Sequence, residues 1–161
     1  MDRRGKIIRA LPRAFLYAYE GTEQGGRIIR LSFRPDPKFV PADRESEVCR
    51  GLQGTMWIDA ASHRFLRAEG TLVRGVNFGW GVLGHLDKGG HFSLRQTEVA
   101  PGTWRITSID LHFTGSMLLF KDFNIDLDTQ SSAFQRVADH LSLVAGADVL
   151  RASATTALAA R

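Results

Sequence analysis

Apolar and polar residues alternate along the segment that follows Gly115. One face of an extended chain would carry the apolar side chains Met117, Leu119, Phe123, Ile125 and Leu127. The opposite face would carry Ser116, Asp122, Asn124 and Asp126. A period of two is that of a β-strand, whose successive side chains point to opposite faces. Residues 117–127 therefore predict a strand with one face in a core and the other in water.

Several earlier segments have the composition of strands and are separated by turn sequences. They are residues 14–20, 27–33, 55–60, 64–73, 91–99 and 103–113. Turn sequences such as GTEQGG and APG join neighbouring segments, which favours hairpins. Successive hairpins make an antiparallel meander, so the expected fold class is mainly β. A sheet with one apolar face must curl over a helix, a ligand or another chain.

Helices are expected only at the margins of this meander. Residues 42–50 predict a short helix. Ser132-Ala133-Phe134-Gln135 fits a capping box, S-x-x-Q, that would open a C-terminal helix over residues 132–145. Its apolar stripe would be Phe134, Val137, Ala138, Leu141 and Val144, with Gly146 at its end.

The 161 residues are enough for one domain with its own core. We expect that domain over residues 14–145, with poorly ordered segments at 1–13 and 146–161. The net charge of +4 is concentrated in the first segment, at Arg3, Arg4, Lys6, Arg9 and Arg13. A basic end of this kind is usually solvated, although it can also contact phosphates or anionic lipid headgroups.

The start of the chain has no apolar run long enough for a signal peptide, and no segment has the length of a membrane-spanning helix. The single cysteine, Cys49, allows no intramolecular disulfide. The arginines outside the first segment are spread over many elements, so no nucleic-acid partner is expected.

Residues 79–84, GWGVLG, match the dinucleotide-binding pattern G-x-G-x-x-G. The pattern requires a helix after its third glycine, but Gly89-Gly90 would stop a helix that follows Gly84 after one turn. One turn cannot cross back to make a parallel strand pair. We therefore expect a long loop between two strands instead of a nucleotide site.

Metal binding and catalysis have little support in the sequence. Asp122, Asn124 and Asp126 imitate a calcium loop, but Leu127 and Ala133 replace its required glycine and glutamate. No histidine pair has zinc-protease spacing. His85 and His91 flank the glycine loop, so a hydrolase that uses one of them with Asp87 is an alternative. No metal, no cofactor and no enzymatic activity are expected.

The segment GLQGTMWIDAASHRFLRAEGTL resembles the G-x-x-W-I-D…R-x-x-G hairpin of the outer-membrane lipoprotein-sorting (LolA/LolB-like) carriers. The likeness is strongest to a branch of exported bacterial proteins related to them, and it extends over residues 14–137. It implies a curved antiparallel half-barrel whose concave apolar side is covered by helices and holds acyl chains. It also implies a periplasmic location and further N-terminal sequence, so that this chain would be the C-terminal part of a longer precursor or a shortened gene model.

Two functions follow from these observations. The first is a non-enzymatic carrier that binds a lipid-like or acylated ligand on its concave face. The second is a structural module that recruits a protein partner through an exposed sheet edge. An apolar face left uncovered by missing N-terminal sequence would favour a homodimer. The residues expected to face the ligand are Trp57, Phe78, Trp80, Leu83, His85, Met117, Leu119 and Phe123.

Overall fold

The computed structural model describes residues 3–79, 83–117, 121–134, 136–137, 140 and 142–159. Its elements in chain order are α1 (Arg3–Ala14), β1 (Phe15–Glu23), the 3₁₀ helix η1 (Gln24–Gly26), β2 (Ile28–Pro35), the 3₁₀ helix η2 (Glu45–Arg50), β3 (Leu52–Asp59), β4 (Phe65–Leu72), β5 (Val76–Phe78), β6 (Gly84–Leu86), β7 (His91–Ala100), β8 (Thr103–Met117), β9 (Lys121–Gln130) and α2 (Leu143–Ala159). Strands dominate, which confirms the expected mainly β class.

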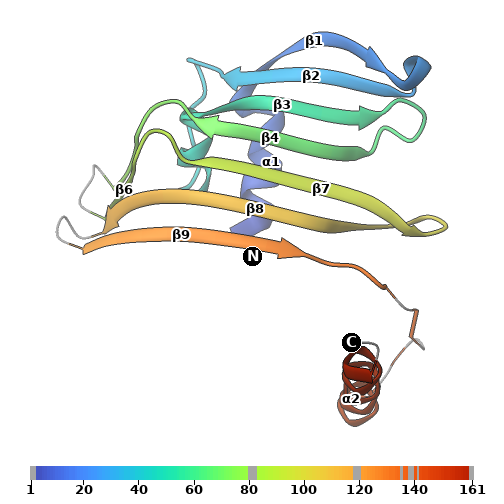
Figure 1. Cartoon of the computed structure of the whole chain (residues 1–161). Helices are drawn as coiled ribbons and strands as arrows, with labels where there is room; N and C mark the ends of the chain where they lie inside the picture. Colours follow the sequence, from blue (N-terminus) through green and yellow to red (C-terminus); the bar gives the residue numbers. More distant parts are fainter. Residues whose placement is uncertain are drawn as a thin grey trace.

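The strands form one open, curved antiparallel sheet (Figure 1). Its order is β1-β2-β3-β4-β7-β8-β6-β5, and β9 pairs with the other edge of β8. The pairs β1–β2, β3–β4, β7–β8 and β8–β9 are hairpins between consecutive strands, as the meander prediction required. Among the described residues, no helix is both long and apolar enough to cross a bilayer.

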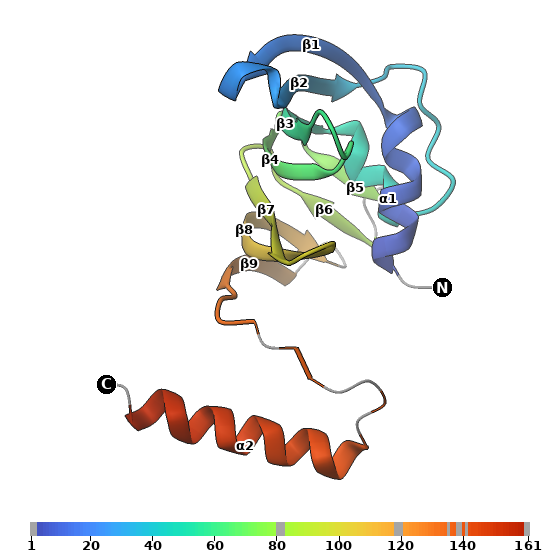
Figure 2. The same cartoon turned by 90° about the vertical axis from the view of Figure 1, so that its right-hand side faces the viewer.

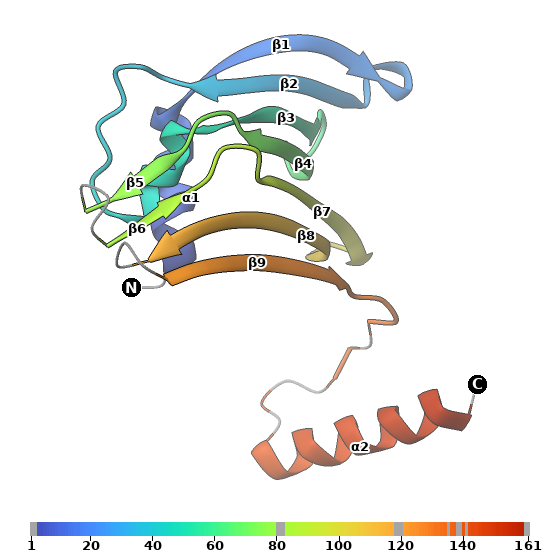
Figure 3. The ribbon, with the colours of Figure 1, turned by 60° about the vertical axis from the view of Figure 1, so that its left-hand side comes forward.

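Residues 76–90 were expected to form a long loop, and this prediction is wrong. Val76 pairs with Leu86 and Phe78 pairs with Gly84, so the segment is a hairpin of β5 and β6 that extends the β4–β7 pair (Figure 3). The chain bends between the two pairs, where the Leu72 N–H donates to the Gly90 carbonyl at 2.7 Å. Val76 and Leu86 are buried, and this apolar alternation explains why the segment pairs.

One face of the sheet is crossed by α1 (Figure 2). Tyr17, Phe33 and Phe92 point to that face: the Tyr17 O–H donates to the Leu11 carbonyl at 2.9 Å, and both phenylalanines belong to or pack against the cluster around Ala14. The sheet curves toward α1, so we call this the concave face. Residues at odd offsets from these positions point to the opposite, convex face.

Two apolar clusters make up the described core. The first contains Ala14, Phe15, Phe33 and Cys49. The second contains Leu72, Val76 and Leu86. Val48 and Leu52, in and just after η2, pack against both clusters, so this short 3₁₀ helix connects the core under α1 with the core under β5 and β6.

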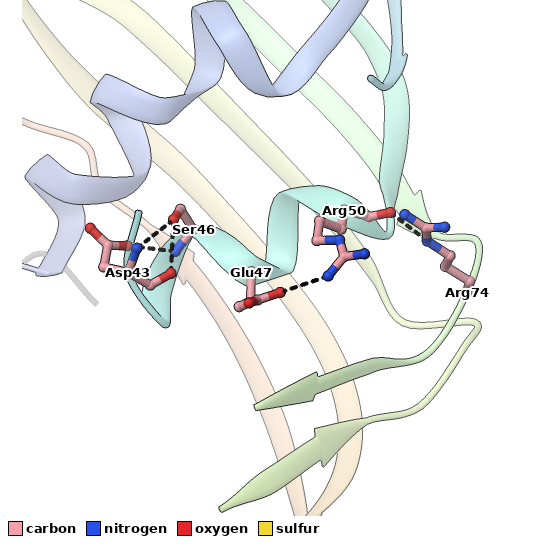
Figure 4. A network of polar contacts seen from close by, with 5 residues as sticks. All are labelled: Asp43, Ser46, Glu47, Arg50 and Arg74. Atoms are coloured by element: carbon pink, nitrogen blue, oxygen red, sulfur yellow. Dashed lines mark hydrogen bonds and ion pairs between the residues drawn. The ribbon is translucent and has the colours of Figure 1, made fainter. Parts of the chain in front are cut away.

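Polar contacts fix η2 in this place (Figure 4). At its start, the Ser46 N–H donates to Asp43 Oδ1 at 2.9 Å, and Ser46 Oγ donates to the Asp43 carbonyl at 2.8 Å. At its end, Arg74 Nε donates to the Arg50 carbonyl at 2.6 Å. The helix predicted over 42–50 is therefore present, as a 3₁₀ helix over Glu45–Arg50.

The prediction for the C-terminal helix is wrong in position. Ala133, inside the expected capping box, has a φ of +54°, which is outside the helical region. The helix α2 instead begins at Leu143, where Ser142 Oγ accepts a hydrogen bond from the Ala145 N–H at 3.2 Å. Gly146 lies within α2 and does not end it. Residues 146–159, expected to be poorly ordered, continue this alanine-rich helix, which lies apart from the sheet in Figure 2.

The N-terminal segment, residues 1–13, was expected to be poorly ordered. In the structure most of it belongs to the helix α1. Ala10, Leu11 and Ala14 are spaced by one and by three to four residues, and all three contact the first core cluster. Pro12 lies within the last turn of the helix and has no N–H to donate to the Ile8 carbonyl, so one helical hydrogen bond is missing there. Burial of the apolar positions against the sheet explains a helix that the charge pattern alone did not predict.

A smaller correction concerns residues 117–127, which were expected to form one strand. Met117 is the last residue of β8 and pairs with Lys121, the first residue of β9. Met117 and Phe123 therefore lie on neighbouring strands of a hairpin instead of on one strand. Both still belong to the concave side of the sheet, as their shared alternation predicted.

Candidate ligand-binding face

An apolar row of side chains crosses the concave face. The pairing register aligns Tyr19, Leu31, Met56, Ala68, Leu94 and Ile109 on β1, β2, β3, β4, β7 and β8. Tyr19 is 66% exposed and Ala68 is buried. The other four side chains are only partly buried. We call this set the apolar row.

The adjacent row on the same face meets α1 at Tyr17 and in the core cluster around Phe33. It consists of Tyr17, Phe33, Gly54, Gly70, Phe92 and Leu111. Gly54 pairs with Gly70, and the rings of Phe33 and Phe92 meet over this pair with centroids 6.5 Å apart. The two rows therefore differ: one is filled by phenylalanine rings, and the other is left partly open, although its Met56 packs against the first core cluster.

Phe78 and Phe123, both predicted to face a ligand, pack against the second core cluster. Leu83 and Met117 are more exposed, at 40% and 46%, and lie at the same end of the sheet. Trp80 and Leu119 lie outside the described residues. The structure thus brings Phe78 and Phe123 together with the core under β5 and β6, beyond the apolar row.

Trp57 lies on the convex face. Its indole N–H donates to Glu23 Oε1 at 3.0 Å, and the Arg67 guanidinium lies 4.7 Å from its ring centroid. Arg67 also pairs with Glu69 on the next position of that face. Trp57 is therefore held in a network of charged side chains, away from the apolar row and from Phe78 and Phe123.

His85 is oriented by its own hairpin. Its Nδ1 lies 2.6 Å from Asn77 Oδ1, and its Nε2 lies 3.5 Å from Asp87 Oδ1. The hydrolase alternative paired His85 or His91 with Asp87, and only His85 contacts that carboxylate. Within the described ranges, neither histidine has a serine, threonine or cysteine side chain at hydrogen-bond distance, which a nucleophile–base pair requires.

His91 belongs to a different cluster, on the convex face. Its ring stacks on that of His112 with centroids 5.3 Å apart, and its Nε2 lies 3.7 Å from Asp110 Oδ1. His112 Nδ1 lies 4.0 Å from Asp126 Oδ2. The described side chains nonetheless include no group of three or more ligands arranged to hold a metal ion.

A hollow of about 760 Å³ lies on the convex face, across β1, β2, β3, β4 and β7. Its floor is the backbone of the row that contains Phe33, Gly54 and Gly70. Its walls are the side chains on either side of that row, among them Ser32, Arg34, Gln53, Thr55, Glu69, Thr71, His91 and Ser93. Leu16 and Ala18 also line it, so this hollow combines polar side chains with apolar surface.

Sequence reasoning missed most of the apolar row. The alternation of each strand was visible, but the residues that become neighbours depend on register. Bulges shift the register after Tyr19 on β1 and after Trp57 on β3. No signal in a single strand shows that Leu31, Leu94 and Ile109 align.

Comparison with known proteins gives no relative: no family model, no curated protein and no solved structure matches this chain.

Proposed function

We propose that the protein is a binding or carrier module that holds an acyl chain of a lipid or an acylated partner along the apolar row. The observation that carries this proposal is the row itself, which is apolar, aligned across six strands and only partly buried. Polar side chains would be expected there if water were its normal neighbour.

The dimensions of the row suit one chain. Six strands at a spacing of about 4.8 Å extend over roughly 24 Å. Half of a bilayer core is about 15 Å thick, so an extended acyl chain fits within the row. Each buried methylene contributes about 0.8 kcal/mol, which makes even partial burial of a chain effective.

The resemblance to the lipoprotein-sorting carriers points the same way. In that fold the concave side of a half-barrel holds acyl chains under covering helices, and here α1 crosses the concave side. The proposal extends to a half-barrel carrier in the periplasm, and this extension rests on the resemblance alone.

Leu94→Gln tests the proposal with a dansyl-labelled long-chain fatty acid as the probe. We expect binding at least about tenfold weaker than in the wild type, because a polar amide would sit in the middle of the row. Leu16→Gln is the matched control, since Leu16 is 39% exposed on the convex face. Equal affinities for both variants and the wild type, with unchanged thermal unfolding, would remove the basis of the proposal.

A second candidate function uses the free edge of β1. The exposed edge strand carries Leu16, Tyr17 and Tyr19, which are 39%, 39% and 66% exposed, whereas the β9 edge carries Asp122, Asp126 and Asp128. Charged edges resist strand addition, and the β1 edge has fewer charges.

If β1 pairs with β1 of another copy, the average molecular mass of the protein in solution will increase with its concentration. Leu16→Lys should make this increase smaller. Sedimentation velocity over a hundredfold concentration range measures this. A constant monomer mass over the whole range would argue against self-association through β1.

A further inference from the structure

A second hollow, of about 500 Å³, lies where α1 meets the segment between β2 and η2. That segment runs beside the helix in Figure 2. Basic side chains at its rim come from Arg9 and Arg13 on α1 and from Lys38 on the segment. Its other lining includes the apolar side chains of Phe39 and Val40. We call these five residues the basic rim.

The charges around this hollow favour an anionic partner. Over its whole length α1 carries arginine and lysine but no acidic residue. Asp36 and Asp43 also line the hollow, so its three basic residues leave an excess of one positive charge, and both carboxylates also accept backbone N–H groups. Asp36 Oδ1 accepts the Lys38 N–H at 2.8 Å, and Asp43 Oδ1 accepts the Ser46 N–H at 2.9 Å.

Val40 distinguishes this surface from a purely ionic one. It is an aliphatic residue that is 83% exposed, next to Lys38 and the partly buried Phe39. Basic residues around an exposed apolar side chain suit the interface of a bilayer, where phosphates and hydrocarbon lie a few ångströms apart. A nucleic acid would use the charges but not the aliphatic side chain.

We propose that the basic rim docks the protein on a bilayer that contains anionic lipids. Arg13 and Lys38 contact lipid phosphates, and Val40 enters the headgroup region. The inference rests on the proposed function, because a carrier of acyl chains must meet a bilayer to load or to unload. It adds which surface of the protein contacts the bilayer and that the lipids there are anionic.

Flotation of the full chain with vesicles tests the proposal. One set of vesicles contains phosphatidylcholine and phosphatidylglycerol at three to one, and the other contains phosphatidylcholine alone. We expect binding to the anionic set at least about tenfold above the neutral set, and a decrease as salt is added. Each basic residue near such a surface contributes about fivefold in affinity, so Arg13→Gln/Lys38→Gln should bind about 25-fold less tightly.

Lys88→Gln/Arg95→Gln is the matched control, because it removes the same charge from two exposed residues outside the basic rim. We expect it to stay within about twofold of the wild type. Val40→Ser should weaken binding to the anionic vesicles without changing net charge. Equal losses in the two double variants, or no preference for anionic vesicles, would overturn the proposal.

Two further measurements separate the other outcomes. A labelled DNA duplex that binds as tightly as the anionic vesicles, and loses affinity with the same double variant, would overturn the bilayer in favour of a nucleic acid. Inorganic phosphate that abolishes vesicle binding at millimolar concentration would show a site for free phosphate instead. The fatty-acid probe reports separately on the apolar row, so Arg13→Gln/Lys38→Gln with normal probe binding and reduced flotation isolates the docking surface.

Discussion

Replacing Gly54 with alanine is expected to destabilise the sheet by about 3 kcal/mol or more. Gly54 pairs with Gly70 on β4, and a Cβ atom on Gly54 would overlap the Glu69 carbonyl oxygen and lie 2.6 Å from the Gly70 Cα. Both neighbours are backbone atoms of a central strand, which cannot move without breaking ladder hydrogen bonds. Thermal unfolding should therefore begin roughly 10 °C lower.

Gly146→Ala makes the same chemical change without the overlap. A Cβ atom there meets nothing within 4 Å, and Gly146 lies in α2. Alanine favours a helix over glycine by about 1 kcal/mol, so the unfolding temperature of the sheet should not fall. An unfolding temperature for Gly54→Ala equal to that of the wild type would contradict the close approach of β3 and β4.

The thiol of Cys49 is expected to react at least about a hundredfold more slowly in the folded protein than in the unfolded chain. Cys49 is fully buried between α1 and the sheet, and this burial raises its pKa from an ordinary 9.0 to about 11. Only the thiolate reacts with alkylating reagents, and its fraction near pH 8 falls about a hundredfold with such a pKa. Iodoacetamide labelling followed by mass spectrometry measures both rates.

The same pKa shift has a consequence for stability. Between about pH 9 and pH 11 the unfolded chain loses the Cys49 proton while the folded protein keeps it, so stability decreases as the pH rises through this window. Cys49→Ala should lose this part of the pH dependence. As a labelling control, Cys49→Ala/Val40→Cys presents an exposed thiol, and it should react as fast folded as unfolded. Equal folded and unfolded rates for native Cys49 would mean that α1 does not cover it.

The sheet could be predicted from the sequence because each strand shows its own alternation. The predicted strand over 103–113 lies within β8. The predicted strands over 14–20 and 27–33, on either side of GTEQGG, extend no more than one residue beyond β1 and β2. The β5–β6 hairpin was missed because its strands are three residues each, and glycines suggested a loop. These two short strands are stabilised by the pairing of β6 with β8 and by the burial of Val76 on β5, and both are tertiary effects.

The helices show where local signals fail. The capping-box pattern at Ser132 competes with Ser142, and the chain uses Ser142. Charge suggested a frayed N-terminus, but burial of Leu11 and Ala14 on the sheet favours a helix there. In both places the outcome depends on what packs against the segment, which a single sequence does not show.

The candidate site was predicted less well than the sheet. The alternation identified a concave apolar face, yet Trp57 lies on the other face and Phe78 and Phe123 are packed in a core cluster. The apolar row emerges only from register, because bulges decide which side chain of β1 stands beside Leu31. A single sequence contains the strands of such a site but not their alignment.

Native mass spectrometry of the purified chain, followed by denaturing extraction to identify anything bound, tests directly whether the concave face binds an acyl chain. We expect a monomer that carries one lipid or acyl-chain mass, and Leu94→Gln should lose that mass while Leu16→Gln keeps it. A protein that remains free of lipid after purification and after incubation with anionic and neutral lipids would contradict the claim that the concave face binds an acyl chain.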